Sequence, residues 1–171
     1  MDRAKVPPPV HEEPSEQDVA AVSEQLGRPI RGTRAIAHRC PCGRPDVVET
    51  VPRLADGTPF PTLYYLTCPR ATAECSRLES AGLMKEMAQR LRDDPELLIR
   101  YQEAHDLYLA RRESIGHVPE IAGISAGGMP DRVKCLHVLL GHSLGADEGV
   151  NPLGDELVEL IDPWWSAGPC V

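Results

Sequence analysis

The chain of 171 residues has no run of apolar residues that approaches the ~20 needed to cross a bilayer. Residues 1–16 also lack the apolar core of a secretory signal. Together these absences predict a cytoplasmic protein. With 42% hydrophobic and 26% charged residues and no evident internal repeat, the chain is long enough to form one ordinary core. We therefore expect a single domain.

Positive charge is scarce: 18 Lys and Arg face 26 Asp and Glu, for a net charge of -8. An acidic surface gains nothing from counterion release on a phosphate backbone, which argues against nucleic acid as a ligand. No Lys or Arg follows Lys134, whereas residues 28–45 hold five arginines and no carboxylate. We expect the basic segment and the acidic C-terminal segment to attract each other in the fold.

Proline-rich residues 1–14 cannot bury enough apolar surface to offset the entropy of ordering, which predicts a flexible N-terminal tail. The domain should then occupy residues 15–171. A helix should start at Ser15, because Asp18 lies three residues on as in a capping box, and should stop at Gly27.

Three short segments rich in β-branched, aromatic or aliphatic residues follow, and turn signals separate them. They predict a three-stranded antiparallel meander. Beyond Pro69 the apolar spacing becomes helical. The predicted strands lie at residues 35–38, 47–51 and 62–67, and the predicted helices at 78–93, 95–116, 130–145 and 151–160. The expected fold class is α+β, with the meander packed by about four to five helices in a single domain.

Five of the six cysteines lie in turn-rich or polar segments. Cys40 and Cys42 terminate the first predicted strand, and Cys68 follows the third, which runs parallel to the first. The three sulfurs should therefore gather at the same edge of the sheet, within reach of one metal. A tetrahedral zinc needs sulfurs about 2.3 Å from the ion, and a Cys-x-Cys turn can direct both of its sulfurs at one point.

A fourth ligand must come from elsewhere in the chain. Cys135 and Cys170 are the leading candidates, and His38 is the local third. His137 and His142 are further possible ligands. On a regular helix Cys135 and His142 lie about 10 Å apart along the axis, and His137 points to roughly the opposite side, so at most one of these three should join the centre.

The centre could hold zinc or an iron–sulfur cluster. In a reducing cytoplasm six cysteines favour thiols or metal ligands over disulfides. Zinc is the more common occupant of cysteine sites in general. Cysteines followed by proline, as at Cys40 and Cys68, also occur in iron–sulfur proteins, so a cubane cluster is the alternative occupant. Buried or redox-idle thiols are an equal alternative to either. Cys75 lies in a helix-like stretch and is expected to be small and buried.

A second possible site lies in a glycine loop. Gly127 and Gly128 lead into the next predicted helix, whose first turns carry Arg132 and Lys134. Free amides, the positive end of a helix dipole and two cations could bind an anion. The alternative, which we favour, is a tight loop with Arg132 paired to a carboxylate such as Asp131.

Several blocks of sequence carry a family resemblance. They are residues 39–50 around Cys40-Pro41-Cys42-Gly43, residues 61–69 ending in Thr67-Cys68-Pro69, residues 132–137, and residues 151–156. With these blocks the chain resembles the bacterial family called domain of unknown function 501, over nearly everything from residue 15 to the end. The resemblance implies no activity for any residue, because the family has no established one.

Three functions are compatible with these observations. The favoured one is a small metalloprotein whose cysteine centre is structural or redox-active and which acts through a protein partner. The second is an enzyme acting on a phosphorylated small molecule at the anion site near 130–134, with His137 or His142 nearby. The third is a thiol enzyme in which one cysteine is the nucleophile and another resolves it, which requires an exposed thiol of lowered pKa.

Overall fold

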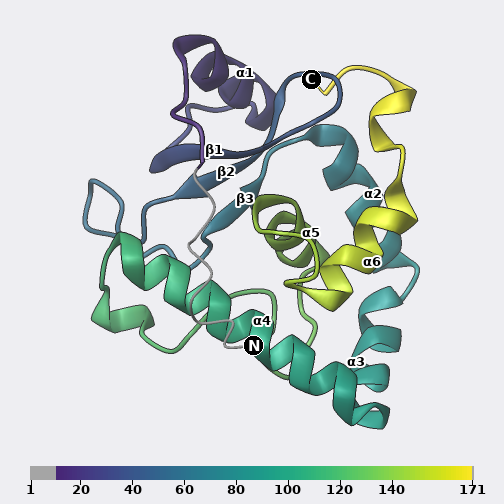
Figure 1. Cartoon of the computed structure of the whole chain (residues 1–171). Helices are drawn as coiled ribbons and strands as arrows, with labels where there is room; N and C mark the ends of the chain where they lie inside the picture. The colour runs from purple at the N-terminus through teal and green to yellow at the C-terminus, as the bar shows by residue number, and fades with distance from the viewer. Residues whose placement is uncertain (1–10, 171) are drawn as a thin grey trace.

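A three-stranded antiparallel sheet organises the fold (Figure 1). The computed structural model describes residues 11–170, so most of the predicted tail lies outside the described residues. The strands are β1 (Thr33–Arg39), β2 (Pro45–Thr50) and β3 (Tyr64–Leu66), in the spatial order β1-β2-β3. The predicted meander is confirmed.

Six α-helices surround the sheet in the described part of the chain, which confirms the α+β class but exceeds the four to five helices expected. They are α1 (Glu16–Leu26), α2 (Pro69–Ser80), α3 (Leu83–Asp93), α4 (Pro95–Ile115), α5 (Leu136–Gly145) and α6 (Pro152–Ile161), with 3₁₀ turns η2 (Pro119–Ile121) and η3 (Trp164–Ala167). The continuous helix predicted over 78–93 is wrong, because Gly82 adopts a left-handed φ of 91° and separates α2 from α3. None of the helices in residues 11–170 is both long and apolar enough to span a membrane.

Helix α1 covers one face of the sheet. The predicted capping box is present, since the Ser15 hydroxyl accepts from the Asp18 amide and the Asp18 carboxylate accepts from the Ser15 amide. Val22 packs from α1 onto Ile36 and Val48 of the sheet. Just before α1, Glu12 pairs with Ile36 through backbone hydrogen bonds, so this part of the predicted tail packs on the domain.

Helix α5 covers the other face and lies at the centre of the molecule, between the sheet and helices α2 and α6 (Figure 1). Leucines on several sides of this helix are buried, as expected for an internal helix. Close packing against β3 requires glycine at position 145, because a Cβ there would lie 2.6 Å from the ring of Tyr64.

Two further expectations from the sequence are wrong. The helix predicted from residue 130 begins only at Leu136, and residues 130–135 form a turn and an irregular segment. The arginines of residues 28–45 do not pair with the acidic C-terminal segment in the described structure. Their ion pairs are Arg31–Asp56, Arg34–Glu49, Arg39–Glu12, Arg39–Asp18 and Arg44–Glu24.

Candidate metal centre

The β1–β2 turn places two cysteines at one end of the sheet. The Cys40 amide donates to the Arg44 carbonyl at 2.9 Å, and the Gly43 amide donates to the Cys40 carbonyl at 2.8 Å, which closes the turn. Cys40 is buried, whereas Cys42 at the tip is exposed. The sequence Cys-Pro-Cys-Gly thus holds one buried and one exposed cysteine on a turn closed by hydrogen bonds.

Cys68 reaches the same end of the sheet from β3, as predicted from a third strand that runs parallel to the first. Leu66 of β3 pairs with Val47, and the Thr67 amide donates to the Asp46 carbonyl at 2.8 Å, next to the residue that pairs with the end of β1. Cys68 itself is fully buried and is the N-cap residue of α2.

The fourth cysteine arrives from the end of the chain. After α6 and η3 the backbone returns to the β1–β2 turn (Figure 1), where Gln25 of α1 donates to the carbonyls of both Cys170 and Pro45, at 2.9 and 2.8 Å. The Cys170 sulfur lies 3.2 Å from that of Cys40. The sulfurs of Cys40, Cys42 and Cys170 all lie within 4.8 Å of one another.

Cys68 neighbours Cys170 and contributes to the raised pKa of that thiol, next to the group formed by the other three sulfurs. Burial raises the pKa of Cys170 and of Cys40. Burial also opposes ionisation of Cys42, but hydrogen bonds from the Arg44 amide and from the neighbouring thiols outweigh it and lower the pKa of Cys42. Simultaneous ionisation of these thiols is therefore unfavourable without an added cation.

Other residues predicted for this centre lie elsewhere. His38 is hydrogen-bonded through Nδ1 to the Asp46 carboxylate at 2.8 Å. His142 is buried in the core, stacked on Tyr64, and burial lowers its pKa to about 3. Cys135 is the N-cap residue of α5 and belongs to a separate group with Glu79 and His137.

This second group joins α2 to the start of α5. The His137 Nδ1 atom lies 3.0 Å from Oε1 of Glu79 and 3.8 Å from the Cys135 sulfur. Burial opposes ionisation of Cys135, but the contact with His137 and the Val138 amide outweigh it, so the pKa of Cys135 is lowered. The pKa of His137 is raised, mainly by Cys135 and also by Glu79. Sequence reasoning missed Glu79, because no local motif marks a carboxylate that meets a helix start 57 residues away.

One premise of the anion site expected in the glycine loop does not hold in the described structure. That site depended on a helix start near residue 130, and the amides of Arg132 and Lys134 instead donate to the carbonyls of Gly128 and Gly127, both at 2.8 Å. The Arg132 side chain lies 3.8 Å from Asp131, as the tight-loop alternative predicted.

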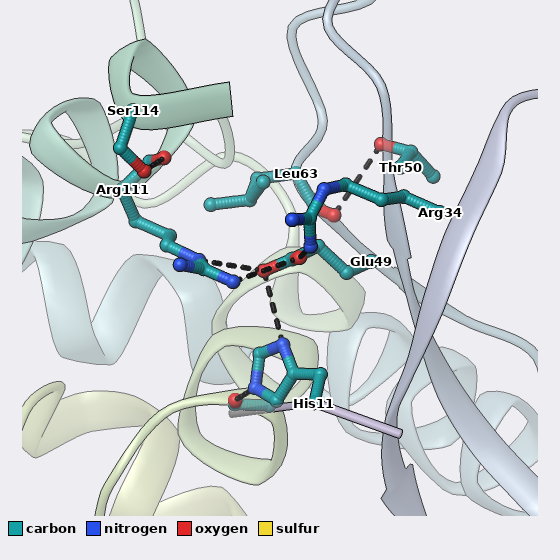
Figure 2. A network of polar contacts seen from close by, with 8 residues as sticks. His11, Arg34, Glu49, Thr50, Leu63, Arg111 and Ser114 are labelled. Atoms are coloured by element: carbon teal, nitrogen blue, oxygen red, sulfur yellow. Dashed lines mark hydrogen bonds and ion pairs between the residues drawn. The ribbon is translucent and has the colours of Figure 1, made fainter. Parts of the chain in front are cut away.

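A third polar group surrounds Glu49 on the central strand (Figure 2). Its carboxylate has no exposed surface and accepts hydrogen bonds from Arg34, Arg111 and His11, at 2.6 to 3.0 Å. His11 also contacts the carbonyl of Gly145 through its other ring nitrogen, at 2.8 Å. Both oxygens of Glu49 are satisfied, so this group joins the segment before α1 to the sheet and to α4 and α5.

The fold and the cysteine group define a small α+β protein with a potential metal centre. A family model described as "Protein of unknown function (DUF501)" matches residues 36–159, well over half of the chain. The protein therefore belongs to this family. The match includes Cys40, Cys42 and Cys68 and ends before Cys170. No curated protein and no solved structure matches the chain.

Proposed function

We propose that the protein is a small metalloprotein in which Cys40, Cys42, Cys68 and Cys170 bind one structural zinc ion. The observation that carries this proposal is the convergence of the Cys40, Cys42 and Cys170 sulfurs within 4.8 Å of one another, with the buried Cys68 at the same end of the sheet. In a tetrahedral site with Zn–S bonds of about 2.3 Å, the sulfurs stand roughly 3.8 Å apart. The sulfurs of Cys40, Cys42 and Cys170, within 4.8 Å of one another, lie near that spacing.

Zinc fits this group better than an iron–sulfur cluster. A cubane cluster occupies the space between its ligands, so its cysteine sulfurs must stand farther apart than the ligands of a single ion. The 3.2 Å between the sulfurs of Cys40 and Cys170 is closer to the roughly 3.8 Å of a single tetrahedral ion than to the wider spacing of a cluster, which supports zinc. A dication also supplies the charge that deprotonated, buried thiols require.

The site favours a structural role. Four thiolates fill the coordination sphere of zinc, whereas a catalytic zinc keeps an open position. The ion would fasten the C-terminal segment to the β1–β2 turn, which are 130 residues apart in sequence. A protein built in this way would act through the surface that the ion stabilises, and hence through a partner.

The first test is elemental analysis and an absorption spectrum of anaerobically purified protein. We expect zinc and a colourless solution; a brown solution with an iron–sulfur spectrum would contradict the assignment. Cys40→Ser and Cys68→Ser should each lower zinc content and Tm together, because metal-binding free energy becomes folding free energy when the site is not preformed. Cys75→Ala, at a buried thiol outside the group, is the matched control and should keep its zinc. Full stoichiometry in both serine variants would refute the proposal.

A further inference from the structure

A second metal site emerges from the group that joins α2 and α5. We infer that Glu79, Cys135 and His137 bind a divalent transition metal, for which zinc is the natural occupant, with one coordination position open to solvent. This site shares no residue with the cysteine centre, and its existence does not depend on that centre.

The geometry resembles a ligand set more than a chain of hydrogen bonds. In a catalytic triad the nucleophile and the acid contact different nitrogens of the imidazole. Here Nδ1 of His137 faces both the Cys135 sulfur and the Glu79 carboxylate. One nitrogen carries at most one proton and cannot donate fully to both, whereas a cation between the three atoms satisfies all of them.

The separations agree with one shared ion. Bond lengths of about 2.0–2.3 Å to zinc place a tetrahedral nitrogen and oxygen roughly 3.4 Å apart, and a nitrogen and sulfur roughly 3.6 Å apart. The corresponding distances are 3.0 Å from His137 to Glu79 and 3.8 Å from His137 to Cys135. All three donor atoms lie within 4.8 Å of one another.

The surroundings hold the ligands in place. The other ring nitrogen of His137 lies 3.3 Å from the Ser76 hydroxyl, and in the tautomer that donates to this hydroxyl Nδ1 carries no proton and can bind a metal. The Leu136 amide donates to Oε1 of Glu79 at 2.8 Å and fixes the carboxylate across the helix interface. Such second contacts orient ligands in metal sites generally.

The donor set selects the class of metal and its coordination. A thiolate and an imidazole disfavour magnesium and calcium, which prefer oxygen, and favour zinc or a similar ion. About a quarter of each side chain of Glu79 and His137 is exposed, so water can reach the ion. Three protein ligands and one solvent position are the arrangement that catalytic zinc sites use.

The inference is tested by metal stoichiometry in the full chain. Protein stripped by a chelator under reducing conditions is titrated with zinc, and then with cobalt, whose absorption spectrum reports the coordinating atoms. Wild type should bind two equivalents and His137→Gln one. Glu79→Gln should likewise bind one tightly, and serves as the second variant if His137→Gln does not fold by circular dichroism.

The control is His117→Gln. His117 lies 2.7 Å from Glu113 in an exposed pair that resembles the His137–Glu79 contact but belongs to neither group of proposed metal ligands, and its loss should leave both equivalents bound. If wild type and His137→Gln bind the same number of equivalents, or if alkylation of Cys135 is unaffected by zinc, the second site is overturned. If only the cysteine centre does not exist, wild type should bind one equivalent and His137→Gln none. The two proposals can therefore fail separately.

Discussion

Glu49 shows how a charge is tolerated on a strand that is buried along its whole length. Two guanidinium groups and an imidazole surround its carboxylate, so every lone pair that burial removes from water finds a donor. Burial alone would raise the pKa of Glu49, but His11 and Arg111 outweigh it and hold the pKa at about 2. Arg111 is itself largely buried and depends on this partner.

Glu49→Gln should lower the free energy of unfolding by about 3 kcal/mol at pH 7, because it leaves the buried Arg111 cation without its counter-charge. Chemical denaturation measures this loss. Glu113→Gln, which removes an exposed carboxylate, is the control and should change stability by less than about 1 kcal/mol.

The stability difference between wild type and Glu49→Gln should also depend on pH. The pKa of Glu49 is lower in the folded state than its ordinary value of 4.5, so its contribution is complete above about pH 5 and is lost as the pH falls towards 2. The stability difference between wild type and Glu49→Gln should therefore narrow over that window. A gap that stays constant from pH 6 to pH 3 would show that the carboxylate charge is not what Arg111 requires.

At the scale of elements, the packing of α6 against α5 depends on a single small residue. Asn151 caps α6 by accepting from the Gly154 amide at 3.0 Å, and Ser143 of α5 donates to the Asn151 carbonyl at 3.1 Å. A Cβ at Gly154 would clash with the carbonyl oxygen of Leu139 and with the Ser143 hydroxyl. The two helices therefore approach as closely as their backbones allow.

Gly154→Ala should destabilise the protein by about 2 kcal/mol, because relief of the clash requires α6 to move away from a packed core. Urea denaturation provides the measurement. Leu160→Ala on the exposed side of the same helix is the control, expected within about 0.5 kcal/mol of wild type. A stable Gly154→Ala protein would mean that the helices can separate at little cost.

At the scale of the whole molecule, the C-terminal segment connects α6 to the β1–β2 turn at the end of the sheet. It passes from α6 through η3, where Trp164 is buried, and ends with Cys170 against the β1–β2 turn. The Pro169 carbonyl accepts from Arg70 of α2, and the Cys170 carbonyl accepts from Gln25 of α1. The proposed zinc would add a further connection between this segment and the β1–β2 turn.

Removal of zinc by a chelator should release this segment, while most of the fold persists through the core on the α5 face of the sheet. Both tryptophans of the chain lie at 164 and 165, so their fluorescence reports on this segment alone. Chymotrypsin should then cleave after them faster, and added zinc should restore protection. Equal cleavage with and without zinc would show that the segment is held by its other contacts.

Local signals in the sequence determined a considerable part of this protein. The capping box at Ser15 and the Asn151-Pro152 helix start depend on neighbouring residues, and the structure has both. The order of the strands placed Cys68 at the same end of the sheet as the β1–β2 turn, because the third strand of an antiparallel meander runs parallel to the first. Such features follow from short-range hydrogen bonding and periodicity.

Tertiary structure alone decided the rest. Cys170 completes the cysteine group and Glu79 meets His137 because helices pack in one particular way, and no spacing in the sequence encodes such a meeting. The apolar pattern continued across Gly82 and the turn before Leu136, and only the backbone geometry ended or delayed those helices. Periodicity reports which face of an element is buried; the packing of the whole chain decides which distant side chains that face will meet.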